Sequence, residues 1–225
     1  MATILIADDH PLFREALRGA VQRLLPDAVL IEADSAATLL ALADAHPNAD
    51  LLLLDLNMPG SHGFSTLIHL RGNQPQLPVI VVSAREEPAI IRRALDHGAA
   101  GFIPKSAGSV QMREAVAEVL AGGTWTPVQV AQAPRIDSEE AQIAQRVREL
   151  TPQQFRVLGM LSTGLLNKQI AYELHVSEAT IKAHMTAILR KLGANNRTQA
   201  VLLAARLAVD PSTVRWPATD AGTFE

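Results

Sequence analysis

Three acidic residues and one lysine follow short apolar runs in the first half of the chain. Asp8 and Asp9 come after the first run, Asp55 after the third and Lys105 after the fifth. Three carboxylates brought close together repel one another, so a divalent cation is the expected compensation. Mg²⁺ is the hard cation that such a site suits, because it takes oxygen ligands and keeps several of its waters. The combination predicts phosphoryl transfer, which needs a nucleophile, a metal and a cation on the transferred group.

These requirements give each residue a role. Asp55 is placed to attack phosphorus, Asp8 and Asp9 to hold the metal, and Lys105 to meet the phosphoryl oxygens. The hydroxyl of Ser83, at the end of the fourth apolar run, could complete the set. The alternative is that the acids cap helices and that Lys105 is a solvated surface lysine. Any one of the residues alone favours that alternative, but four such groups on four strand ends are hard to obtain from capping.

The elements that must position these side chains alternate along the first 120 residues. Short apolar runs are separated by longer stretches with apolar residues three and four apart, which predicts a parallel, doubly wound α/β sheet. We expect strands at 3–7, 29–33, 50–54, 78–82 and 100–103. Ligands of such sheets bind at the carboxyl ends of the strands where the strand order reverses. The acids therefore converge if the first and third strands are neighbours.

The rest of the chain predicts a small all-helical domain. We expect an α/β domain over 1–122, a linker over 123–147, the helical domain over 148–210 and a tail over 211–225. Ser138 is predicted to open a short helix in the second half of the linker. Thr151 and Gln154 predict a capping box, while Asn167 and Ser177 are predicted to cap the next two helices.

The helix expected over 178–192 has one apolar side and one polar side. The apolar side carries Ile181, Met185, Ile188, Leu189 and Leu192. The opposite side carries Lys182, Thr186 and Arg190, with Glu178, Ala179 and Ala183 beside them. Small residues allow close approach to a DNA groove, and Thr or Ala methyl groups can read the methyl group of thymine. The alternative is an ordinary solvated helix face.

The charge of the chain is divided in the same way as its predicted structure. Residues 1–120 hold 9 basic and 14 acidic residues, a net of −5, whereas residues 151–206 hold 7 and 2, a net of +5. The two parts therefore have different partners, and the basic part is compatible with nucleic acid. The chain has no cysteine, no start typical of a secretory signal, and no apolar stretch near the roughly 20 residues that span a bilayer. We expect a cytoplasmic protein with no membrane partner.

The first half resembles the receiver domain of two-component response regulators. The resemblance is carried by Asp8-Asp9, Asp55-Leu-Asn-Met-Pro-Gly60, Ser83-Ala84 and Gly101-Phe102-Ile-Pro-Lys105. It implies that Asp55 accepts a phosphoryl group from a phosphohistidine of a sensor histidine kinase. It also implies that the backbone carbonyl of Asn57 ligates Mg²⁺, and that Ser83 and Phe102 form a switch pair in which Phe102 turns inward.

The second half resembles the C-terminal domain of NarL/FixJ-type, LuxR-like regulators. The matching residues run from Leu150-Thr-Pro through Val176-Ser177-x-x-Thr180-Ile181-Lys182-x-His184 to Leu192, with Asn196-Arg197-Thr198-Gln199-Ala200 after them. The resemblance makes 178–192 the recognition helix of a helix-turn-helix. It implies dimer contacts through Val201 and Leu202. The family often has a basic residue at position 186, where this chain has Thr, so we expect a different operator. The residues expected near double-stranded DNA are Lys168, Thr180, Lys182, Ala183, His184, Thr186 and Arg190.

Together these features predict a transcription regulator that depends on phosphorylation and is not an enzyme. We expect it to form a homodimer when it is phosphorylated or bound to DNA. Before phosphorylation, the first domain is expected to cover part of the recognition helix or to disfavour the dimer. A phosphohydrolase of the aspartyl-phosphate type is the main alternative, but it needs a second acid where this chain has Asn57. A regulator that binds DNA without phosphorylation is a third possibility, and the intact acidic pocket argues against it.

Overall fold

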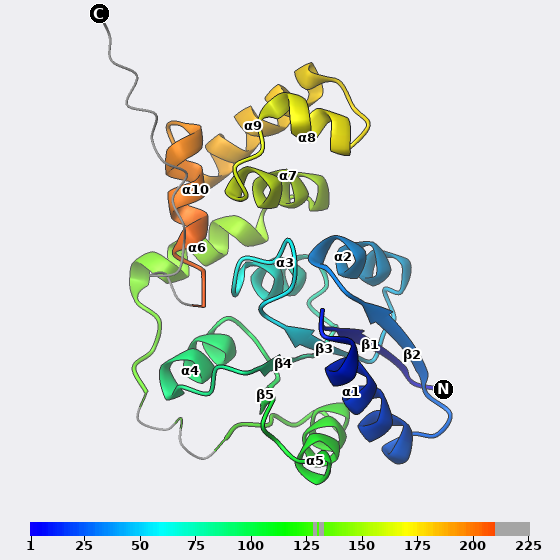
Figure 1. Ribbon diagram of the computed structural model, residues 1–225. Coiled ribbons are helices and arrows are strands. Elements are labelled where there is room, and N and C mark those ends of the chain that lie inside the picture. Colours follow the sequence, from blue (N-terminus) through cyan, green and yellow to red (C-terminus); the bar gives the residue numbers. More distant parts are fainter. Residues whose placement is uncertain (128–129, 131–132, 210–225) are drawn as a thin grey trace, which may run out of the picture.

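Five parallel strands form one sheet in the order β2-β1-β3-β4-β5 (Figure 1). Their bounds are β1 (Thr3–Ala7), β2 (Val29–Ala33), β3 (Leu51–Asp55), β4 (Val79–Ser83) and β5 (Gly101–Pro104). The computed structural model describes residues 1–127, 130 and 133–209, and the predicted tail lies outside them. The predicted doubly wound sheet is confirmed, with β3, β4 and β5 each beginning one residue later than expected. β1 and β3 are neighbours in the sheet, and the strand order reverses between them.

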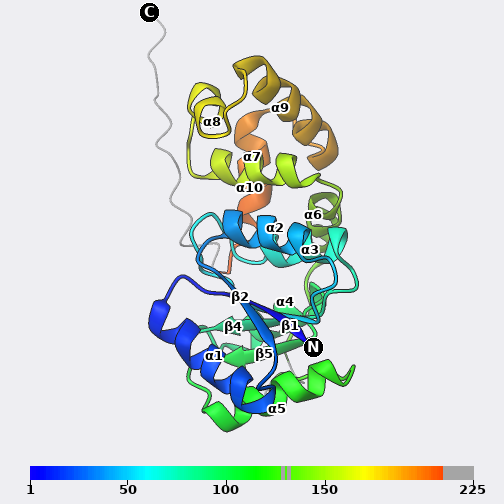
Figure 2. The ribbon, with the colours of Figure 1, turned by 90° about the vertical axis from the view of Figure 1, so that its right-hand side faces the viewer.

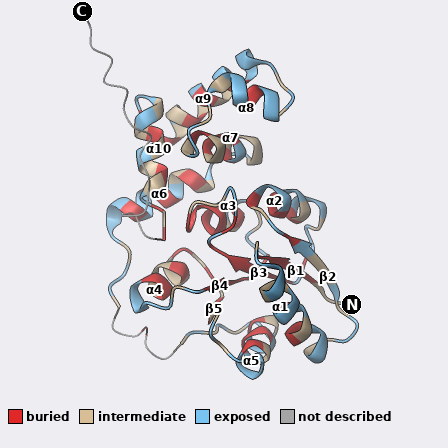
Figure 3. Ribbon diagram, viewed as in Figure 1, coloured by how far each residue is buried: buried red, intermediate tan, exposed pale blue. Residues whose placement is uncertain are grey.

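Helices cover both faces of the sheet, because every strand of its centre is apolar on both sides. The helices of this α/β part are α1 (Pro11–Leu24), α2 (Ala36–Ala45), α3 (Ser65–Asn73), α4 (Pro88–Asp96) and α5 (Ser109–Leu120). In β3, Leu51 and Leu53 pack with α1 and α5, whereas Leu52 and Leu54 pack with α2, α3 and α4. Figure 3 shows the resulting buried sheet between two layers of helices.

Among the described residues, the helical part contains five helices with clear local start signals. They are α6 (Ser138–Arg148), α7 (Pro152–Ser162), α8 (Asn167–Glu173), α9 (Glu178–Leu192) and α10 (Arg197–Ala205). The capping box of Thr151 with Gln154 and the N-cap of Ser177 are confirmed. The prediction for Asn167 is wrong, because it is the first residue of α8. Helix α6 does begin at Ser138, and its N-cap is Asp137.

The helical part rests on the face of the α/β part formed by α2, α3 and α4 (Figure 2). One apolar core runs without interruption from this face into the helical part, with α6 packed along α3. The ring of His69 on α3 stacks on the ring of Phe155 on α7, with centroids 4.2 Å apart and planes 2° from parallel. We call this packing the docked arrangement. Within the described ranges, no helix combines the length and apolarity needed to cross a membrane.

Candidate functional site

The carboxyl ends of β1, β3 and β5 bring together the predicted acidic pocket. Asp8 and Asp55 have side chains that are 0% and 1% exposed. Lys105 reaches both carboxylates, with its Nζ 2.7 Å from Oδ2 of Asp8 and 2.8 Å from Oδ2 of Asp55. Three of the predicted residues thus form one buried charge cluster, which the adjacency of β1 and β3 produces.

Asp9 and His10 stand at the mouth of this pocket. Oδ1 of Asp9 lies 2.7 Å from Nδ1 of His10. Asp8, Asp9, His10 and Asp55 each offer a ligand atom within 4.8 Å of the others, which is a spacing that can hold a metal ion. Sequence reasoning missed His10, although its position directly after the two acids was an available signal. The carboxylate donors fit a hard cation such as Mg²⁺.

The pocket opens to solvent as a cavity of about 400 Å³ lined in part by His10, Asp55, Asn57 and Lys105. Burial lowers the pKa of Lys105, but its hydrogen bonds and charge interactions with Asp55 and Asp8 outweigh burial and raise the pKa above its usual value. Lys105 therefore remains a cation at neutral pH. Its Nζ also lies 4.8 Å from the centre of the Phe13 ring, a cation–π contact.

The acids of the pocket do not cap helices as the alternative required. Asp55 Oδ1 accepts a hydrogen bond from the backbone N–H of Asn57 at 3.1 Å, and α3 begins only at Ser65. Asp8 Oδ1 accepts one from the backbone N–H of His10 at 2.8 Å, where α1 has not yet begun. Both carboxylates are oriented by their own loops. They remain available to ligands at the open side of the pocket.

The two residues of the predicted switch pair are both buried. The Ser83 hydroxyl accepts a hydrogen bond from the backbone N–H of Arg85 at 3.1 Å. Phe102 is 0% exposed and belongs to the apolar core shared with the helical part. In this structure the ring of Phe102 lies inside the core. The switch role of the pair stays a prediction.

The outer side of α9 forms the second candidate site. The inner side is closed by Ile181, Met185, Ile188 and Leu192, all buried. The expected DNA residues Lys168, Thr180, Lys182, Ala183, Thr186 and Arg190 are exposed, and His184 is half-buried. Helix α9 lies on the side of the helical part that faces away from the sheet (Figures 1 and 2). On α10, Leu202 is 41% exposed and Val201 is half-buried.

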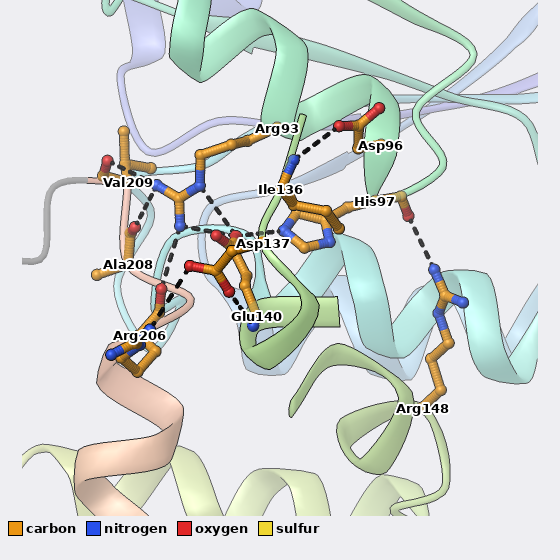
Figure 4. Close-up of polar contacts among 10 residues, drawn as sticks. All are labelled: Arg93, Asp96, His97, Ile136, Asp137, Glu140, Arg148, Arg206, Ala208 and Val209. Atoms are coloured by element: carbon orange, nitrogen blue, oxygen red, sulfur yellow. Dashed lines mark hydrogen bonds and ion pairs between the residues drawn. The ribbon is translucent and has the colours of Figure 1, made fainter. Parts of the chain in front are cut away.

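A polar cluster joins α4 to α6 and to the segment after α10 (Figure 4). Arg93 donates from Nε to Oε1 of Glu140 at 2.9 Å, and its two Nη atoms donate to the carbonyl oxygens of Arg206, Ala208 and Val209. His97, fully buried, lies 2.7 Å through Nε2 from the same Oε1 of Glu140. We call Arg93, His97 and Glu140 the α4 clamp. Sequence reasoning missed it, because its partners are 43 to 116 residues apart.

Two family models match the chain. The response regulator receiver domain matches residues 4–117, and the family of bacterial regulatory proteins called luxR matches residues 148–204. The chain therefore belongs to the two-component response regulators, within the NarL/FixJ type that carries a LuxR-like helix-turn-helix. It is a phosphorylation-dependent DNA-binding transcription regulator.

Named relatives agree with this assignment along nearly the whole chain. The glycerol metabolism activator of Pseudomonas putida is 43% identical over 91% of this chain and 95% of its own length. The nitrate/nitrite response regulator NarL of Escherichia coli is 32% identical over 89% of this chain and 94% of its own. The structure of RcsB of Salmonella enterica bound to a promoter with the phosphomimetic BeF3− is similar, with 27% sequence identity and a TM-score of 0.51. The match covers 90% of this chain and 97% of the RcsB chain.

Proposed function

We propose that Asp55 is the phosphoacceptor of this regulator and that a sensor histidine kinase donates the phosphoryl group. The observation that carries the proposal is the buried contact of Lys105 with both Asp8 and Asp55. A buried carboxylate that is open to solvent on one side can act as a nucleophile. The cation paired with it already compensates the negative charge of the phosphoryl group that it would receive.

In the reaction, an oxygen of Asp55 forms a bond to phosphorus while the bond from phosphorus to the kinase imidazole nitrogen breaks. Oδ1 is oriented by the backbone N–H of Asn57. Lys105 then moves from the carboxylate to the transferred oxygens, and the Ser83 hydroxyl is within the same strand-end cluster to bond another. Mg²⁺, when bound, neutralises the phosphoryl oxygens. Asp8, Asp9, Asp55 and the backbone carbonyl of Asn57 would hold it.

Labelling with acetyl phosphate and Mg²⁺ tests this assignment. The full-length protein is expected to take up one phosphoryl group, and Asp55→Asn to take up none. Asp50→Asn is the matched control, because Asp50 directly precedes the same strand and accepts a hydrogen bond from the backbone N–H of Thr3. Equal labelling of Asp55→Asn, or an unlabelled native chain, would overturn the proposal.

A turnover assay with a small phosphomonoester separates a regulator from a phosphohydrolase. Asn57 has no carboxyl group to serve as the second acid, so we propose that the phosphoryl group remains on the protein in stoichiometric amount. Release of many phosphates per chain from a small phosphomonoester would instead identify an enzyme.

We propose that α9 enters the major groove of double-stranded DNA as a homodimer binds two half-sites. The support is the exposed row of Lys182, Thr186 and Arg190 above a fully closed apolar side. Lys168, Thr180, Ala183 and His184 border that row, and Leu202 with Val201 supplies the dimer contact.

Replacing Lys182 by Ala is expected to weaken binding to all DNA sequences and to reduce its salt dependence, since one phosphate contact is lost.

The docked arrangement changes our expectation for the control of binding. The outer side of α9 is exposed in the docked arrangement, so we propose that control acts through the dimer rather than by masking of the recognition helix. The other expectation, that the dimer is disfavoured, remains. The loop after Asp55 supports it, because the backbone N–H of Phe64 donates to the carbonyl of Leu207 at 2.8 Å and His62 Nε2 lies 3.1 Å from the carbonyl of Gly159. Asp55 is thus linked by one loop to the end of α10.

Loosening the α4 clamp tests this control. Arg93→Ala removes the bonds to α6 and to the segment after α10, so the unphosphorylated protein is expected to dimerise and bind DNA more tightly, about as the phosphorylated protein does. Arg92→Ala is the matched control, since Arg92 pairs at 2.9 Å with Asp96 of its own helix. Unchanged dimerisation of Arg93→Ala, measured by sedimentation, would show that the docked arrangement does not restrain the dimer.

A further inference from the structure

Along the middle of α9 the exposed surface is made of small side chains that end in methyl groups. Ala179, Ala183 and Thr186 follow one another at helical spacing on the outer side of the helix, and all three are exposed. Longer basic side chains stand beside them, Lys182 near the start and Arg190 near the end. A helix with this profile can come close to the floor of a groove while its long cations reach the rims.

The hydroxyl group of Thr186 is turned back onto its own helix. Its Oγ1 donates a hydrogen bond to the backbone carbonyl of Lys182 at 3.1 Å. This is the bond that Thr commonly makes to the carbonyl four residues earlier. In this conformation the single hydrogen of the Thr186 hydroxyl is used within α9, and the side chains of the two alanines carry no donor.

The absence of a donor decides which base edges this stripe can recognise. Guanine presents two acceptors in the major groove, N7 and O6, and is read by donors such as Arg or Lys. A stripe without donors leaves both acceptors unpaired, which costs binding free energy. The methyl group of thymine is the apolar feature of the major groove, and the methyl groups of Ala and Thr contact it without polar cost.

We infer that Ala183 and Thr186 are specificity-determining residues that read thymine methyl groups in the centre of each half-site. The inference rests on the proposed function, because it requires α9 to lie in the major groove. Ala179 contributes close approach, and Lys182 and Arg190 contribute phosphate contacts. Thr186 keeps the two acceptor lone pairs of its hydroxyl oxygen, so an amino group of adenine or cytosine is the competing partner at that position.

Selection from a random DNA library, followed by removal of single methyl groups, tests the inference on the native full-length protein. The selected half-site is expected to contain thymine at one or two central positions. Replacing each of these thymines by deoxyuracil changes only the methyl group, and it is expected to weaken binding about fourfold per methyl group. The same replacement at flanking thymines is expected to have no effect.

Two variants of Thr186 separate the methyl group from the hydroxyl group. Thr186→Val keeps the methyl group of Thr186 and its β-branched shape, and should still distinguish thymine from deoxyuracil. Thr186→Ser keeps the hydroxyl and should lose that distinction at one position. Thr38→Ser makes the same change on an exposed residue of α2 and should leave the distinction intact. Thr186→Lys adds a donor and should shift the selected base toward guanine.

The outcomes distinguish a failure of the inference from a failure of the proposed function. Binding that shows no sequence preference, or no binding at all, would overturn the proposed role of α9. Specific binding that tolerates deoxyuracil at every position would overturn the inference alone. A preference kept by Thr186→Ser and lost by Thr186→Val would assign the reading to the hydroxyl oxygen, and that result would also overturn it.

Discussion

Lys105 allows two buried carboxylates to lie side by side at the end of the sheet. Its Nζ is within 2.8 Å of oxygens on both Asp8 and Asp55, and the same two carboxylates belong to the group that could hold a metal ion. Lysine and metal therefore compete for the same negative charge. At the scale of single residues, the negative charge of Asp8 and Asp55 can be compensated either by Lys105 or by a metal ion.

Removing the lysine exposes this balance. Lys105→Met is expected to lower the free energy of unfolding in metal-free buffer by about 3 kcal/mol, because it leaves two buried carboxylates without the cation that balances their charge. Added Mg²⁺ should then raise the melting temperature of the variant more than that of the native protein. Lys182→Met is the control, since its exposed pair with Glu178 at 3.3 Å is worth about 0.5 kcal/mol or less. Thermal unfolding with and without Mg²⁺ measures both effects, and equal stability of Lys105→Met would contradict the charge balance.

At the scale of elements, the loop between β3 and α3 is the piece that connects the pocket to the helical part. Gly63 in this loop has a φ of +60° and lies against the backbone of Leu207 and Val209. A Cβ at this position would stand 2.5 Å from the carbonyl oxygen of Leu207, and backbone atoms cannot swing aside as a side chain can. Only glycine satisfies both the backbone conformation and the space.

Gly63→Ala should therefore separate the loop from the end of α10. The amide hydrogen of Phe64, bonded to Leu207, is expected to exchange with solvent much faster in this variant. Gly122→Ala is a close control, because Gly122 has a φ of +88° and nothing within 4 Å of the added Cβ. It carries the same backbone penalty, about 1 kcal/mol, without the collision. Slow exchange of the Phe64 amide in Gly63→Ala would show that the loop tolerates the collision.

At the scale of the whole molecule, His62 and His69 lie, like His97 of the α4 clamp, where the two parts meet. Burial lowers the pKa of His69 to about 4, against a smaller opposing effect of a backbone hydrogen bond. Burial also lowers the pKa of His62, opposed by its bond to Gly159. Both rings are therefore neutral in the docked arrangement and would titrate near 6.5 if the parts separated.

The sign of the pH dependence follows from these directions. The separated state binds more protons, so docking keeps its full stability above about pH 6.5 and loses it as the pH falls toward 4. At pH 5 the loss from His69 is on the order of 1 to 2 kcal/mol. Glu140 acts at lower pH: burial raises its pKa, but the hydrogen bonds from His97 and Arg93 outweigh burial and lower it below 4.5. Measurements between pH 7.5 and 5 therefore isolate the histidines.

Energy transfer between two labels measures the separation directly. The chain has no cysteine, so one introduced on α5 and one on α8 can be labelled cleanly. The distance is expected to increase between pH 7.5 and 5 in the native protein and to change less in His69→Phe, which keeps the stacked ring. His175→Asn, an exposed histidine in the turn before α9, is the control. A pH-independent distance in the native protein would contradict the role of the buried rings.

Much of this molecule was predictable from local patterns. The period of apolar residues predicted every strand within one residue, and Thr151, Gln154 and Ser177 predicted their helix starts, because hydrogen bonds over three residues decide a cap. The acidic pocket was also predictable, since parallel strands bring their carboxyl ends to one edge and the strand order follows known rules. Asn167 was misassigned because Gln169 satisfies the backbone N–H of Leu166 from inside α8.

By itself, then, the sequence determined the two folds, the strand-end pocket and the polar side of α9, all of which depend on residues near in the chain or on one sheet edge. Only the tertiary structure decided how the two parts meet. The α4 clamp, the stacking of His69 on Phe155 and the place of Gly63 against Leu207 join residues far apart in the chain. Such contacts depend on the fit of two finished surfaces, and no periodicity or cap records that fit.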